Sequence, residues 1–197
     1  MLPRGARLFL LAGIEMEKPM KQMTLFKEKE KPYVYKKYAY RLCVVRDKRI
    51  KFRKEPVSNQ VEGAGFIREA IKKLGQTDRE NMVVVMLNTK NHVIGINLVS
   101  IGCLNASYAS PRDVFKAAIN SNCAALILGH NHPSGVCQAS AEDMMITKNI
   151  VLSAEILGFT IHDHIIVDTE SDHFYSFSHD GILDRMKIAA KETISRL

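Results

Sequence analysis

The chain has 197 residues, of which 46% are hydrophobic and 25% are charged, and these fractions are typical of a soluble globular protein. No apolar run approaches the ~20 residues that a membrane-spanning helix needs, so no segment is expected to span a membrane. The formal net charge of +7 is unevenly placed, because residues 1–55 carry 16 Lys and Arg against 6 Asp and Glu, whereas residues 56–197 carry 12 against 15.

The first part of the chain, residues 1–55, is predicted to be a basic N-terminal extension. Residues 1–32 are expected to be irregular, since they end in a run of alternating charges followed by a proline. Two strands, residues 40–46 and 50–53, are predicted to form a hairpin around a charged turn. Such a segment can bind nucleic acid through its phosphates, or it can be a solvated tail. We favour the tail, because no known DNA-binding motif accompanies the charge.

The remainder, residues 56–197, is predicted to be one α/β domain. A helix is expected over residues 61–74, where apolar residues recur on one face, and a glycine ends it. Two strands over residues 82–87 and 92–99 are predicted to form a hairpin. Ser110 and Pro111 predict the start of a helix, and a short buried strand follows at residues 124–128.

The second half of this domain repeats the alternation of helix and strand. Ser140 begins a long helical pattern that Gly158 ends. Residues 159–168 and 174–177 predict two more strands, and residues 182–197 predict a final amphipathic helix. Because the first two strands form a hairpin while later strands and helices alternate, we expect a mixed β-sheet flanked by helices.

The four cysteines, Cys43, Cys103, Cys123 and Cys137, show no Cys-x-x-Cys spacing. They are interpreted as reduced thiols of a cytoplasmic protein. The sequence leaves their pairing open.

The pattern that bears most on function lies between a predicted buried strand and the helix that begins at Ser140. His130 and His132 are two residues apart in an extended backbone, so their imidazoles point to the same side. A loop follows, and Asp143 lies one turn inside the helix. Two imidazoles and one carboxylate suit Zn²⁺, with a fourth position open for water as in catalytic sites. As an alternative, Ser140 and Asp143 are also the residues of a helix N-cap.

The whole pattern, His-x-His-Pro-x6-Ser-x2-Asp, resembles the JAMM motif of the JAB/MPN metalloenzyme family. The longer string from His130 to Gly135 is similar to the RadC branch of that family, as are residues 110–114 and 163–167. Gly129 is a departure, since that branch usually has Ala there. The resemblance covers residues 60–180 and implies the cytidine-deaminase-like JAB/MPN fold.

The resemblance also implies roles for the site residues. His130, His132 and Asp143 would hold a zinc ion, and the Ser140 hydroxyl would stabilise a developing oxyanion. Glu80, just before the first predicted strand of the domain, would act as the general base, as an upstream Glu does in that family. The implied activity is hydrolysis of a peptide or isopeptide bond in an unknown protein or peptide substrate.

Two functions of different classes remain open. The first is this zinc-dependent hydrolase, and the second is a DNA-repair or replication accessory module that binds nucleic acid or protein with little or no catalysis. A zinc nucleobase deaminase is excluded, because the chain lacks the His-x-Glu and Pro-Cys-x-x-Cys motifs. Asp163 and His164 are interpreted as support near the site or as structural residues, and neither is taken as a ligand.

Overall fold

The computed structural model describes residues 10–15, 36–40, 56–102 and 110–196, and the chain separates into two compact units, Met1–Asp47 and Lys48–Leu197. In the first unit, β1 (Leu10–Glu15) pairs antiparallel with β2 (Lys36–Tyr40). The expectation of irregular chain is therefore wrong for β1, whose backbone gains partners from a strand distant in sequence. The predicted hairpin beyond Tyr40 and the predicted boundary at residue 55 fall outside the described residues and stay predictions.

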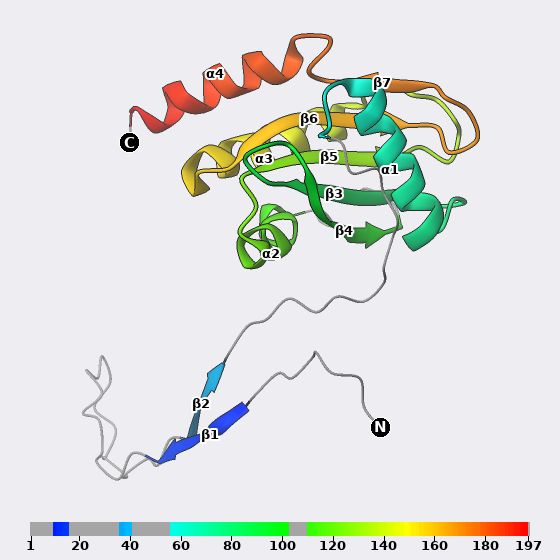
Figure 1. Cartoon of the computed structure of the whole chain (residues 1–197). Helices are drawn as coiled ribbons and strands as arrows, with labels where there is room; N and C mark the ends of the chain where they lie inside the picture. The colour runs from blue at the N-terminus through cyan, green and yellow to red at the C-terminus, as the bar shows by residue number, and fades with distance from the viewer. Residues whose placement is uncertain (1–9, 16–35, 41–55, 103–109, 197) are drawn as a thin grey trace, which may run out of the picture. The chain divides into compact units, whose positions relative to one another are not determined.

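The second unit is built on a five-stranded sheet with the strand order β4-β3-β5-β6-β7 (Figure 1). The β5–β6 pair is parallel and the other three pairs are antiparallel, so the predicted mixed sheet is confirmed. The strands are β3 (Asn81–Leu87), β4 (Val93–Ile101), β5 (Ala125–Asn131), β6 (Thr160–Val167) and β7 (Phe174–Ser176).

The four predicted helices of this unit are present, and side-chain caps mark the starts of three of them. They are α1 (Gln60–Leu74), α2 (Pro111–Ser121), α3 (Ala141–Leu157) and α4 (Ile182–Ile194). Ser110 and Ser140 cap α2 and α3 through their side chains, and Gly158 ends α3 in the left-handed conformation with φ 77°. Each helix in the described part of the chain is too short or too polar to cross a bilayer.

The sheet is the middle of three layers, because β3 sends alternate side chains to two separate hydrophobic clusters. Val83 and Val85 pack in the cluster that contains the buried face of α1. Met82 and Val84 pack in the cluster formed with α2, α3 and α4. All seven residues of β3 are buried, as expected for a strand covered on both faces.

Strand β5 continues three residues past its predicted end and delivers polar side chains to the two faces. Leu126 and Leu128 belong to the cluster on the α3 side, so the alternation places His130 on that side. Gly129 instead faces α1, where a Cβ atom added to it would lie 2.4 Å from Cδ1 of Ile67. A small residue is required there because Ile67 is fully buried and its side chain fills the space.

This contact predicts that Gly129→Ala destabilises the fold. The added methyl group must displace the buried Ile67 side chain, which should lower the free energy of unfolding by about 1–3 kcal/mol in urea denaturation. Gly65→Ala in α1 is the matched control, since no atom lies within 4 Å of its added Cβ, and there Ala should be neutral or stabilising. Equal stability of Gly129→Ala and wild type would contradict the packing argument.

Candidate metal centre

The three predicted ligands converge at the end of β5 and the start of α3. Nε2 of His130 lies 3.1 Å from Nε2 of His132 and 3.1 Å from Oδ1 of Asp143. Nε2 of His132 lies 3.6 Å from Oδ2 of Asp143, and each residue offers a ligand atom within 4.8 Å of the others. His130 and Asp143 are buried and His132 is half-buried, so the cluster is closed on the protein side and open at one edge.

The carboxylate of Asp143 is held by the cap of α3. The backbone N–H of Ser140 donates to Oδ2 of Asp143 at 2.8 Å, and the Ser140 hydroxyl donates to the same oxygen at 2.7 Å. The backbone N–H of Asp143 donates in return to Oγ of Ser140 at 3.1 Å. The cap and the ligand set, which the sequence presents as alternatives, are therefore compatible, because the cap uses Oδ2 while Oδ1 faces His130.

The chemistry of the three groups fits a divalent metal ion. Nδ1 of His132 lies 2.7 Å from the carbonyl oxygen of Val136, which can only accept a hydrogen bond. Nδ1 therefore carries the proton, and in the neutral ring Nε2 presents a lone pair to the cluster. Both ion-pair partners of Asp143 within the described residues are histidines, so a cation at this point would complete the charge balance.

The same contacts shift the titration of the ligands. Burial raises the pKa of Asp143, but the contacts with His130 and His132 outweigh burial and hold that pKa well below its usual range. The hydrogen bond to Asp143 raises the pKa of His132, and burial opposes it only in part. In the metal-free protein Asp143 is thus a carboxylate at neutral pH, while His132 retains its proton to a higher pH than an ordinary histidine.

Glu80 lies beside this cluster, immediately before β3. The antiparallel register of β3 and β5 sets Met82 opposite His130, so Glu80 comes level with His132. Glu80 is half-buried, and its charge contributes to the raised pKa of His132. Ser140, the remaining predicted site residue, is exposed at the start of α3.

Two buried asparagines, which the sequence analysis did not single out, hold the backbone on both sides of Glu80. Oδ1 of Asn131 accepts from the backbone and side-chain N–H groups of Asn81, both at 2.9 Å. Nδ2 of Asn131 donates to the carbonyl oxygen of Arg79 at 2.9 Å. Two features of the sequence could have indicated this pair. Asn81 is a polar residue directly before the apolar run 82–87, and Asn131 lies between the two motif histidines.

His164 of β6 also enters the site, where it contacts one of the candidate ligands. Its Nε2 lies 2.9 Å from Nδ1 of His130, and its Nδ1 lies 2.6 Å from the hydroxyl of Thr147. Burial lowers the pKa of His164 well below the ordinary histidine value, so the ring is neutral. It is not a member of the ligand cluster.

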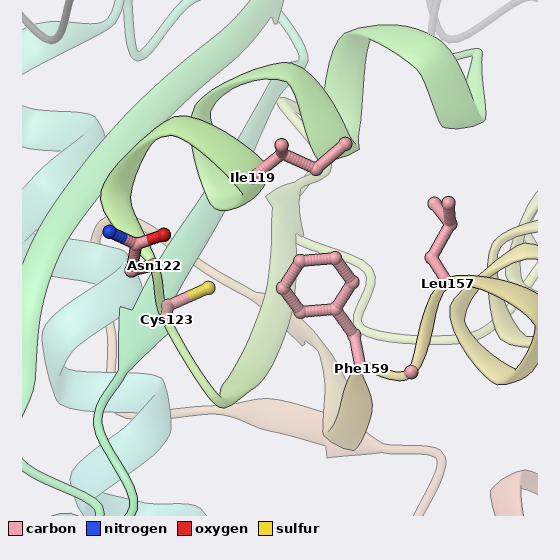
Figure 2. A pocket seen from close by; sticks show the side chains of 6 residues that line it. Ile119, Asn122, Cys123, Leu157 and Phe159 are labelled. Carbon is pink, nitrogen blue, oxygen red and sulfur yellow. The ribbon is translucent and has the colours of Figure 1, made fainter.

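A surface hollow lies between the C-terminal ends of α2 and α3 (Figure 2). It is found where β5 and β6 begin, whereas the candidate ligands lie where β5 ends. The hollow therefore belongs to the opposite end of the sheet from the candidate metal centre. Its lining residues are Ile119, Asn122, Cys123, Leu157, Gly158 and Phe159.

Comparison with known proteins reveals similarity to one family. A family model described as "RadC-like JAB domain" matches residues 61–182, which include all five predicted site residues. The chain is 47% identical over 111 residues to a UPF0758 protein of Moorella thermoacetica, covering 56% of this chain and 47% of that protein. It is 39% identical over 127 residues to a UPF0758 protein of Rubrobacter xylanophilus, covering 64% and 53%. The chain thus spans about half the length of the curated relatives it matches.

Removal of a candidate ligand is expected to abolish metal binding. Wild-type protein incubated with a divalent metal and freed of excess should hold about one ion per chain, and Asp143→Ala and His132→Ala should each lose it. Elemental analysis gives the metal content. Asp113→Ala is the matched control that should keep the metal, because Asp113 receives the same kind of cap from Ser110 in α2 but pairs with a lysine. Folded wild-type protein without metal would contradict the assignment.

Metal affinity should fall as the pH is lowered through the pKa of His132. That pKa is raised, so protons compete for Nε2 of His132 already above the ordinary histidine range, while Asp143 stays ionised. We expect a loss of about tenfold in affinity per pH unit below the pKa of His132, measured by chelator competition. The free energy of unfolding of the metal-free protein should instead decrease as the pH rises. Protonated His132 stabilises the fold below its unfolded pKa, and this stabilisation is lost as the pH rises through the folded pKa. A metal affinity that does not vary between pH 6 and 8 would be inconsistent with this account.

Proposed function

Because the chain belongs to the RadC-like JAB domain family, we propose that it is a zinc-dependent metallohydrolase of the JAMM type that cleaves a peptide or isopeptide bond. One observation carries this proposal. Two imidazoles and a carboxylate converge within 4.8 Å at a partly open edge of the fold, with the carboxylate of Glu80 close to one of the imidazoles. That combination is what hydrolysis by an activated water requires.

Zinc is the proposed ion, and His130, His132 and Asp143 are its proposed ligands. Two nitrogen donors and one oxygen donor are typical of catalytic zinc sites, which keep a further position for water or substrate. When bound, such an ion supplies Lewis acidity and makes water reactive near neutral pH. The half-buried His132 marks the edge from which a substrate would approach.

Glu80 is the proposed general base. Its place beside His132 brings a carboxylate to the same edge of the cluster, and the paired asparagines Asn81 and Asn131 restrain the backbone that carries it. In this role Glu80 takes a proton from the attacking water and then donates it to the leaving amine. Glu80 lies in a loop just before β3, so the position of its carboxylate depends on the hydrogen bonds that Asn81 and Asn131 make to the neighbouring backbone.

Ser140 is the proposed donor to the developing oxyanion. In the structure its single hydroxyl proton is directed to Oδ2 of Asp143 at 2.7 Å. The role therefore requires the hydroxyl to exchange this donation for one to the substrate oxygen in the transition state. The backbone N–H of Ser140 also donates to Oδ2, so Asp143 would keep one donor during that exchange.

The second candidate function is nucleic-acid binding by an accessory module. The observation that favours it is the charge of residues 1–55, which contain 16 Lys and Arg but only 6 Asp and Glu. Such a segment would bind phosphates without reading sequence, and its affinity would fall steeply with salt. The two candidates make opposite predictions for a variant of Glu80.

Glu80→Gln should abolish hydrolysis while leaving metal content unchanged. Loss of the base should slow zinc-loaded protein by about 10²–10⁴-fold on linear and isopeptide-linked peptide libraries analysed by mass spectrometry. Glu155→Gln, at an exposed position in the later part of α3, is the matched control and should keep full activity. Absence of cleavage by wild-type protein, together with salt-sensitive DNA binding that survives Glu80→Gln, would reject the hydrolase and favour the accessory module.

A further inference from the structure

A chain of hydrogen bonds lies behind the candidate metal centre and joins the backbone of Asp143 to the ring of His130. It runs from the backbone carbonyl of Asp143 through Thr147 and His164 to Nδ1 of His130, and Nε2 of the same ring lies 3.1 Å from the carboxylate of Asp143. We propose that Thr147 and His164 are positioning residues that keep the proton of His130 on Nδ1, so that Nε2 is free to bind a metal ion. This inference rests on the metal-binding part of the proposed function.

The direction of the chain is set at its first link. The hydroxyl of Thr147 lies 2.5 Å from the carbonyl oxygen of Asp143, one turn earlier in α3. A carbonyl oxygen can only accept, so the single hydroxyl proton of Thr147 is used there. The hydroxyl oxygen of Thr147 must then accept in its other contact.

The second link fixes the tautomer of His164. Its Nδ1 lies 2.6 Å from the Thr147 oxygen and is therefore the nitrogen that carries the proton. The ring is 1% exposed and bonds to a hydroxyl and an imidazole rather than to a carboxylate, which favours the neutral form whose Nε2 holds a lone pair. The ring of Phe177 stacks on His164 at 4.8 Å between centroids and 14° between planes, which holds it in this orientation.

The third link fixes which nitrogen of His130 carries the proton. Nε2 of His164 can only accept, so Nδ1 of His130, 2.9 Å away, is the donor. In the neutral form of this ring, Nε2 of His130 then carries no proton, and it lies 3.1 Å from both Nε2 of His132 and Oδ1 of Asp143. Without the relay, His130 could place its proton on Nε2 and donate it to Asp143, which would block the metal.

The arrangement differs from a structural hydrogen bond between two buried histidines. The chain starts at a backbone carbonyl, which can only accept a hydrogen bond. At each later hydrogen bond, one atom can again only accept, so its partner must carry the proton. Only one placement of the protons therefore allows every hydrogen bond in the chain to form. An imidazole ligand oriented through its other nitrogen in this way binds metal more tightly, and loss of such a partner typically costs about 10–100-fold in affinity.

The test measures zinc affinity of the full chain by competition with a chromophoric chelator, using zinc alone as the probe. His164→Leu should bind zinc about 10–100-fold more weakly than wild type. His164→Gln should retain most of the affinity, because its side-chain carbonyl can still accept from Nδ1 of His130. Thr147→Val should lower the affinity less than His164→Leu, because it releases the tautomer of His164 without removing the ring.

The matched control is His162→Leu on the same strand. His162 is half-buried and bonds to Asn91 rather than to the ligand cluster, so its removal should leave zinc affinity unchanged. An equal loss in His162→Leu and His164→Leu would overturn the inference, since the effect would then come from general loosening of β6.

Side-chain ¹⁵N NMR of the metal-free wild-type protein provides a readout independent of folding in the variants. Above about pH 8, where neutral rings are expected, His130 and His164 should both be protonated on Nδ1. A proton on Nε2 of His130 would overturn the inference even if His164→Leu fails to fold. Equal zinc affinity of wild type and folded His164→Leu would overturn it while leaving the metal site intact, whereas wild-type protein that binds no zinc would overturn the inference and the proposed function together.

Discussion

The buried carboxylate of Asp143 is the group on which the site depends. A buried charge is costly unless polar groups compensate for it, and here they come from three directions: donors at the N-terminus of α3, and the imidazoles of His130 and His132. Together they lower the pKa of Asp143 in spite of its burial. The negative charge held in this way is what makes the point attractive to a cation.

The contrast between α2 and α3 shows what the two histidines add. Both helices begin with Ser-x-x-Asp and both place the serine hydroxyl 2.7 Å from the aspartate, at Ser110–Asp113 and at Ser140–Asp143. Asp113 is only half-buried and pairs with a lysine on its own helix, so its contacts are those of a cap at the start of a helix. Asp143 is covered by the sheet, and β5 ends at that point with two imidazoles. The same local motif therefore forms part of a candidate metal site only where the end of a strand brings two imidazoles to it.

Successive side chains at the end of β5 point to opposite faces of the sheet and make different contacts there. His130 faces α3 and the carboxylate, whereas Asn131 binds Asn81 and the carbonyl of Arg79. Consecutive residues thus orient the ligand set and the segment that carries Glu80. A shift of one residue in the pairing of β3 with β5 would exchange these faces and separate Glu80 from the ligands.

The sequence was sufficient for the helices, the mixed sheet and the convergence of the three candidate ligands, because caps, hydrophobic periodicity and a strand–loop–helix unit are local in the chain. It could not decide that His164 lies against His130, or that Asn81 and Asn131 clamp the backbone around Glu80. Those contacts depend on the parallel register of β5 with β6 and the antiparallel register of β3 with β5, which join residues far apart in the chain. Strand register follows from how the hydrophobic faces pack between α1 and α3, and only the tertiary structure contains that information.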